Sequence, residues 1–156
     1  MKAVADTSPL ILLEKAGCLW ILGKLCQTVV IPPAVDQEWL RPGGYELPGW
    51  LHVSDLTPEA KITAEKLTEK LDKGEAEAIA LFQSIGADLL LLDDLKGRKE
   101  AITRKLSVTG TVGVLVAAKR KGLIAELGPI LDILKKQRYY LSDDLFAKAL
   151  MLAGEK

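Results

Sequence analysis

Acidic side chains follow the strand-like segments of this chain, at the places where side chains of a parallel sheet can meet. Asp6 follows the apolar segment 2–5, and Asp93 and Asp94 follow the continuous apolar run at 88–92. If the two segments are neighbouring strands, their carboxyl ends adjoin, because paired strands lie about 4.8 Å apart. Carboxylates so close raise one another's pKa unless a cation neutralises them, and Mg²⁺ and Mn²⁺ prefer oxygen ligands. These residues therefore predict a site for a hard divalent ion.

Two of these aspartates also have a structural interpretation as helix N-caps. Asp6 could cap the helix predicted over 8–16, because aspartate is a favoured N-cap residue. However, Ser8 is followed by proline, and that pair is itself a good helix start. We therefore expect Ser8 to cap this helix and Asp6 to point into the crevice at the strand ends. By the same reasoning Asp94 caps the next predicted helix, which leaves Asp93 at the strand end.

Three glutamates on predicted helices are further candidates. Glu38 lies about a turn and a half into the helix after "IPP", where either surface exposure or an inward role fits. Glu75 and Glu77 stand in the first turn of a helix after Gly74, where acidic residues interact favourably with the helix dipole. Glu75 aligns with the predicted core stripe of that helix, so we expect it to point inward. Glu77 remains a flanking candidate.

Strand-like and helix-like segments alternate along the chain and predict an α/β fold. A mainly parallel sheet with helices on both faces follows from this alternation, and ligands bind such sheets at the carboxyl ends of the strands. Strands are expected at 2–5, 28–31, 88–92 and 107–109, with a candidate edge strand at 50–53. Helices are expected at 8–16, after 31, and at 58–72, 75–86, 95–106, 114–124, 126–137 and 143–153.

Length and composition limit the possible classes. The 156 residues are expected to form a single domain, 1–156, with a C-terminal helical extension at about 126–156. The hydrophobic share of 49% and charged share of 27% are typical of soluble domains, and no apolar run is long enough to cross a membrane. Charged residues interrupt the N-terminal apolar stretch, so we expect a cytoplasmic protein. Two cysteines and one histidine argue against structural zinc and histidine catalysis.

The net charge of zero hides a basic segment. Residues 96–138 contain eleven lysines and arginines but only three carboxylates. Such a segment can guide a polyanion to one surface, although solvated helix faces would produce the same pattern. Lys96, Arg98 and Lys99, next to the acidic pair, are the candidates for contacts with nucleic acid.

Several blocks of the chain resemble the PIN-domain family over nearly its whole length. They are "VADTSPLILLEKAG", "VIPPAVDQEW", "LDKGEAEAIAL", "ADLLLLDDLKGRKEA", "VTGTVGVLVAAKRKGLI" and "YYLSDDLFAKALMLAGE". The resemblance is closest to a prokaryotic branch labelled as a domain of unknown function and described as similar to VapC-type toxins. It implies a three-layer α/β/α sandwich and a Mg²⁺- or Mn²⁺-dependent ribonuclease.

The resemblance also implies site residues and partners. The acids of the family fall on Asp6, Glu38, Glu75 and either Asp93 or Asp94, and the hydroxyl residue after the first acid falls on Thr7 or Ser8. The third acid is usually aspartate in such nucleases and is glutamate here. An RNA substrate, a small antitoxin protein and a homodimer are the implied partners.

Two other functions remain open at this point. A catalytically inactive PIN-like module could bind nucleic acid or protein while its acids cap helices. A phospho-accepting signalling domain also clusters aspartates at strand ends, but it would want adjacent acids after the first strand, where Thr7 and Ser8 stand instead.

Overall fold

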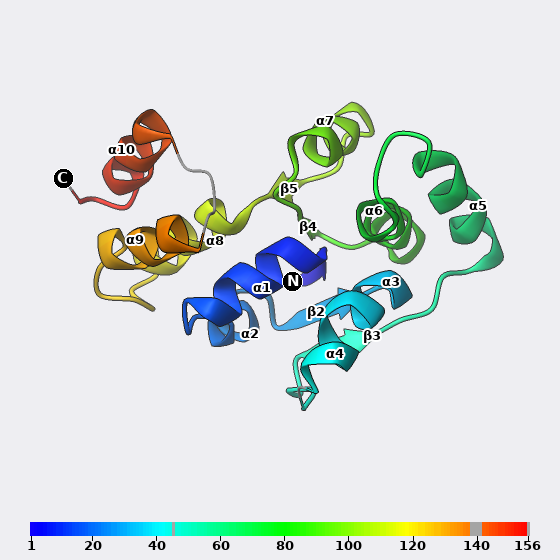
Figure 1. Ribbon diagram of the computed structural model, residues 1–156, viewed down its shortest axis with the longest axis horizontal. Coiled ribbons are helices and arrows are strands. Elements are labelled where there is room, and N and C mark those ends of the chain that lie inside the picture. Colours follow the sequence, from blue (N-terminus) through cyan, green and yellow to red (C-terminus); the bar gives the residue numbers. More distant parts are fainter. Residues whose placement is uncertain (45, 138–141, 156) are drawn as a thin grey trace.

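A single parallel sheet forms the centre of the computed structural model, which describes residues 1–44, 46–137 and 142–155. The strand order is β3-β2-β1-β4-β5, and every pairing is parallel (Figure 1). The strands are β1 (Lys2–Ala5), β2 (Thr28–Ile31), β3 (Leu51–Val53), β4 (Leu89–Leu91) and β5 (Val108–Thr109). All of the expected strands are therefore present, and the candidate edge strand is β3.

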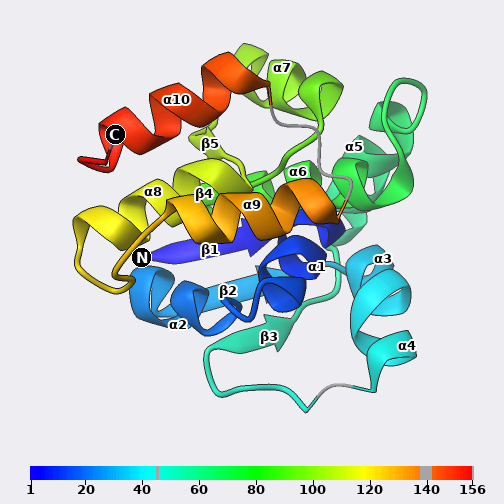
Figure 2. The same cartoon turned by 60° about the vertical axis from the view of Figure 1, so that its left-hand side comes forward.

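Helices cover both faces of the sheet. Side chains alternate along β1, so that Ala3 and Ala5 join one apolar core while Val4 joins the other. The first core packs against α1 (Thr7–Lys15), α2 (Trp20–Cys26), α8 (Thr111–Arg120), α9 (Gly128–Lys136) and α10 (Asp143–Leu152). The second packs against α5 (Pro58–Leu67), α6 (Lys73–Ile85) and α7 (Leu95–Thr103). Figure 2 shows α1, α2 and α9 in front of the strands, which confirms the expected α/β/α sandwich.

The chain after β2 departs from the expected regular helix. It consists of α3 (Pro33–Val35), a π-helix η1 (Asp36–Leu40) and α4 (Arg41–Gly43). A π-helix has a wider turn than an α-helix and occurs mostly as a short insert, often at functional sites. Glu38 lies within this wide turn, so the α-helical spacing used to place it does not apply.

The first helix starts one residue earlier than expected. We expected Ser8 as its N-cap, and this was wrong, because α1 begins at Thr7 and Asp6 occupies the N-cap position. The side chain of Asp6 nevertheless makes no capping hydrogen bond to the helix. Its carboxylate therefore does not make the usual N-cap contact with the first turn of α1.

Two further differences concern an additional helix and the end of another. The helix α2 was not expected, and α5 ends at Leu67 rather than near 72 because the chain turns into the N-cap of α6 at Asp72. Residues 138–141 and 156, which fall inside the expected extension 126–156, lie outside the described residues. Within the described residues, no helix is both long and apolar enough to cross a membrane.

Candidate metal centre

Asp6 stands where the two central strands end together. Its backbone N–H donates to the carbonyl of Leu91 at 3.0 Å, which ties the end of β1 to the end of β4. The residue is only 5% exposed. Burial raises the pKa of its carboxyl from 3.8 to about 7, because the charged form loses its solvation. The value of about 7 also includes the nearby carboxylates of Asp72, Glu38 and Asp93, which raise the pKa, and a hydrogen bond from the amide of Thr7, which lowers it.

Glu38 approaches Asp6 from the π-helix. Its Oε2 accepts a hydrogen bond of 2.9 Å from the Thr7 hydroxyl, so the start of α1 holds the carboxylate in place. Both carboxylates meet at Gly74 near the start of α6. A Cβ on Gly74 would stand 2.9 Å from Asp6 Oδ1 and 3.5 Å from each Glu38 oxygen. Glu38 is exposed at the surface, and its carboxylate lies next to Gly74, as that of Asp6 does.

Asp93 is fixed at the end of β4 by the start of α8. It accepts hydrogen bonds from the backbone N–H of Thr111 at 2.7 Å and from the Thr111 hydroxyl at 2.6 Å. Beside it, a Cβ on Gly110 would stand 2.5 Å from Asp93 Oδ1 and 2.9 Å from Arg98 Nη1. Thr111 is fully buried. Two donors therefore hold Asp93 at the same edge of the sheet as Asp6.

Glu75 and Asp94 form a second acidic group together with Asp72. Glu75 and Asp72 make a reciprocal capping box at the start of α6, with bonds of 2.8 and 3.1 Å. Asp94 caps α7 by accepting from the N–H of Gly97 at 3.1 Å, as expected. Burial raises the pKa of the Glu75 carboxyl to about 8, and the Asp72 and Asp94 carboxylates add to this increase, which an amide hydrogen bond from Asp72 opposes. Glu75 and Asp94 therefore lie close together.

Asp72 was missed by the sequence analysis although a signal was present. The spacing Asp72-x-x-Glu75 is a capping-box pattern, which places its first residue at the start of a helix. That pattern identifies a structural role only. The proximity of Asp72 to Asp6 depends on how α6 packs against the end of β1.

The remaining candidates have different surroundings. Glu77 is buried, and its Oε1 accepts a hydrogen bond of 2.9 Å from the N–H of Ala34, so it holds the start of α3. Ser8 is exposed, whereas Thr7 supplies the hydroxyl that contacts Glu38. Lys96 and Lys99 line a separate hollow beside α7.

Carboxylate oxygens are the donors that a metal ion would find at this edge of the sheet. Among the described residues, no three acidic, histidine or cysteine side chains are arranged to hold one metal ion together. Two carboxylates do converge, at Gly74, where the missing side chain leaves room between them. Mg²⁺ is commonly held by one or two carboxylates and retains several waters. The convergence of Asp6 and Glu38 fits a partly hydrated hard cation, with Asp93 fixed nearby.

Comparison with known proteins agrees with the fold. A PIN-domain family model, DUF3368, matches residues 2–155. No curated protein matches the chain.

Proposed function

Because the chain belongs to the PIN-domain family over residues 2–155, we propose that it is a ribonuclease that uses Mg²⁺ or Mn²⁺. PIN domains are generally nucleases and typically use divalent metal ions. The observation that carries the proposal is the convergence of Asp6 and Glu38 at Gly74. A nearly buried carboxylate with a pKa of about 7, surrounded by other carboxylates, is a place where a cation relieves electrostatic repulsion.

In this proposal each residue at the strand ends has a defined role. Asp6 and Glu38 bind the metal ion, and Thr7 keeps Glu38 oriented through its hydroxyl. Asp93 faces the same space, and Thr111 keeps it oriented. When bound, a divalent ion supplies positive charge next to the phosphodiester and makes water easier to deprotonate. Oriented groups of this kind require little rearrangement during the reaction.

Glu75 and Asp94 would extend the site on the side of α6 and α7. Their proximity creates a second place where positive charge is favourable, so a second ion or the coordinated waters of the first could be held there. Glu77 supports the site indirectly, because it anchors the start of α3, which leads to Glu38.

A toxin role with a small antitoxin and a homodimer belongs to the same proposal. Exposed apolar side chains on two helices support a homodimer, namely Trp20 on α2 (46% exposed) and Ile62 on α5 (56% exposed). A cytoplasmic location would bring such a toxin to cellular RNA. Expressing the chain alone and with the product of its adjoining gene tests the pairing, because growth arrest should occur only in the first case.

A catalytically inactive binding module is the second candidate. It is favoured by the helix-capping roles of Asp94 and Glu75 and by the contact of Glu77 with the start of α3. Helix capping alone would explain these acids without any chemistry. It does not explain Asp6, which caps nothing with its side chain and is nearly buried.

A cleavage assay distinguishes the two functions. Purified protein should cleave single-stranded RNA in Mn²⁺ and stop in EDTA, and the Asp6→Asn variant should be inactive. Asp132→Asn, which removes an exposed carboxylate on α9, is the matched control and should retain full activity. Equal cleavage by the wild-type protein and Asp6→Asn would remove Asp6 from the reaction and contradict the proposal.

A further inference from the structure

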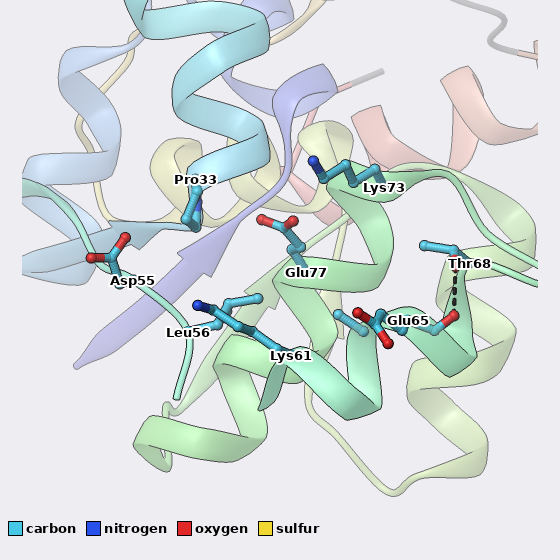
Figure 3. A pocket seen from close by; sticks show the side chains of 9 residues that line it. Pro33, Asp55, Leu56, Lys61, Glu65, Thr68, Lys73 and Glu77 are labelled. Carbon is cyan, nitrogen blue, oxygen red and sulfur yellow. Dashed lines mark hydrogen bonds between the residues drawn. The ribbon is translucent and has the colours of Figure 1, made fainter. Parts of the chain in front are cut away.

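Two cavities adjoin the acidic centre from different sides. The larger, about 460 Å³, lies where α5 and α6 meet the start of α3, and Figure 3 shows the Glu77 carboxylate between Pro33 and Lys73. The smaller, about 280 Å³, lies between α8 and α10 and reaches Gly110, which lies against Asp93. The larger cavity includes Lys73, which precedes Gly74, where Asp6 and Glu38 converge, and the smaller includes Gly110, which lies against Asp93.

The charges of the two cavities differ. The larger one carries the carboxylates of Asp55, Glu65 and Glu77 together with Lys61 and Lys73. Among the described residues, the charged groups that line the smaller one are cations only, Arg98 and Lys148. An RNA phosphate is therefore attracted to the smaller cavity and finds mixed charge in the larger one.

We propose that the cavity between α8 and α10 binds one nucleotide of the RNA strand next to the phosphodiester that is cut. This inference rests on the proposed ribonuclease function. It adds a substrate subsite to which α10, α8 and Arg98 of α7 contribute.

Arg98 connects this cavity to the acidic centre. Its Nη1 lies near Gly110, at the same point that Asp93 Oδ1 approaches. A guanidinium carries five N–H donors in a rigid fork, so one edge can face Asp93 while the other contacts a phosphate. Arg98 thus stands where an RNA strand would pass from the acids into the cavity.

Apolar side chains form the rest of the wall. They are Val112 and Val116 on α8, and Leu145 and Leu152 on α10. Leu145 is 41% exposed and Leu152 is 48% exposed, which is costly for large apolar side chains unless something covers them. A ribose or base would cover them while Lys148, on the same helix, contacts the phosphate.

The fold holds α10 in the position that the cavity requires. Ala149 and Ala153 are buried in the first core. Glu155, just after the helix, accepts hydrogen bonds from the N–H groups of Leu127 and Gly128 at 2.8 and 3.2 Å, and its Oε2 lies 3.2 Å from Lys119 Nζ. The cavity is therefore part of the folded domain.

RNA binding by charge variants tests the role of Lys148. Anisotropy of a labelled single-stranded RNA is measured over a salt series in the full chain with Asp6→Asn, which prevents cleavage. Adding Lys148→Met should raise Kd about fivefold at low salt and reduce the slope of log Kd against log salt by about 0.7, as for one lost phosphate contact. Lys24→Met makes the same charge change at an exposed position of α2, just before the start of β2 and so at the opposite end of the strands from the acids, and should have no such effect.

A filling variant tests the cavity without changing charge. Leu152→Trp should occupy the cavity and raise Kd for the same RNA, whereas Met151→Trp should not, because Met151 is 69% exposed and does not line the cavity. Circular dichroism confirms that both variants remain folded.

The outcomes distinguish a failure of the ribonuclease function from a failure of the subsite alone. If the native chain neither binds nor cleaves RNA, the ribonuclease function fails and the subsite fails with it. If RNA is cleaved but Lys148→Met and Leu152→Trp bind like their controls, the subsite is overturned and the ribonuclease function stands.

Discussion

A carboxylate that is almost completely buried beside other carboxylates is unfavourable at neutral pH unless a proton or a cation joins it. Asp6 is in this situation, with a pKa of about 7 in the metal-free protein. The usual bond of an N-cap aspartate does not account for this arrangement, because the Asp6 side chain makes no capping bond. The unfavourable charge is explained if the residue is kept for binding a metal ion.

The raised pKa of Asp6 leads to a stability prediction. Below the unfolded-state pKa of 3.8, Asp6 is protonated in both states and costs nothing. As pH rises toward about 7, the unfolded chain loses this proton while the folded state retains it, so folding loses stability. Asp6→Asn should therefore stabilise the metal-free protein by roughly 2–4 kcal/mol at pH 8 and change little at pH 3.5. Urea unfolding in EDTA measures both values, and equal effects at the two pH values would contradict the account.

The second prediction is that Gly74→Ala weakens metal binding without destabilising the helix α6. Alanine is a better helix former than glycine by about 1 kcal/mol, so Gly74→Ala should not destabilise α6 by itself. Its Cβ would, however, stand 2.9 Å from Asp6 Oδ1 and force the acids apart. Mn²⁺ affinity should fall by about 10- to 100-fold, as when groups that orient ligands are lost.

The control for Gly74→Ala is Gly128→Ala at the start of α9. The nearest atoms to its Cβ would be 3.7 and 3.8 Å away, which is ordinary contact. Calorimetric titration with Mn²⁺ compares the two variants. The steric role of Gly74 is wrong if both bind Mn²⁺ as the wild-type protein does.

At the residue scale, the sequence predicted the acids at strand ends better than their partners. Asp6 and Asp93 could be placed together because each follows a buried strand. Asp72 could not, because its capping pattern identifies a helix start and not the neighbours of that start in space.

At the scale of elements, helix starts hold the acids in position. The start of α1 orients Glu38 through Thr7, and the start of α8 orients Asp93 through Thr111. A hydroxyl that donates to a carboxylate makes a strong, charge-assisted hydrogen bond. The sequence analysis found the acids and the hydroxyl after Asp6, but it did not find Thr111, because its contact with Asp93 depends on the pairing of β4 with β5.

Thr111→Val tests this arrangement, because valine keeps the shape and removes the hydroxyl. The variant should lose about 1.5–3 kcal/mol of stability with the lost bond to a charged acceptor. It should also lower the kcat of RNA cleavage, since Asp93 loses the hydroxyl that helps to orient it and retains the bond from the backbone N–H of residue 111. Chemical unfolding and steady-state kinetics measure the two effects, and an unchanged kcat would show that the orientation of Asp93 is unimportant.

The π-helix η1 shows where element prediction fails in physical terms. The sequence "IPPAVDQEWL" has a good helix start after Ile31 and predicts a regular α-helix with 3.6 residues per turn. The π-helical turn is wider, and this changes which side chains share a face of the helix. Regular α-helical spacing therefore does not predict the contact between Glu38 and Thr7.

At the scale of the whole molecule, the continuous burial of the central strands specifies the layers. Buried runs in β1, β2 and β4 indicate a sheet covered on both faces, and the two apolar cores confirm it. The parallel order β3-β2-β1-β4-β5 then brings the ends of β1 and β4 together. The α/β architecture was thus predictable from strand and helix patterns, whereas the position of α10 beside α8 was not, because it depends on packing of Ala149 and Ala153.

The most direct test of the central claim is a calorimetric titration of Mn²⁺ into the metal-free protein at pH 8, where Asp6 is ionised. The account predicts saturable binding to the wild-type protein and to Asp132→Asn, and loss of that binding in Asp6→Asn. Equal Mn²⁺ affinity in Asp6→Asn and the wild-type protein, or no binding to either, would contradict a metal centre at the ends of β1 and β4.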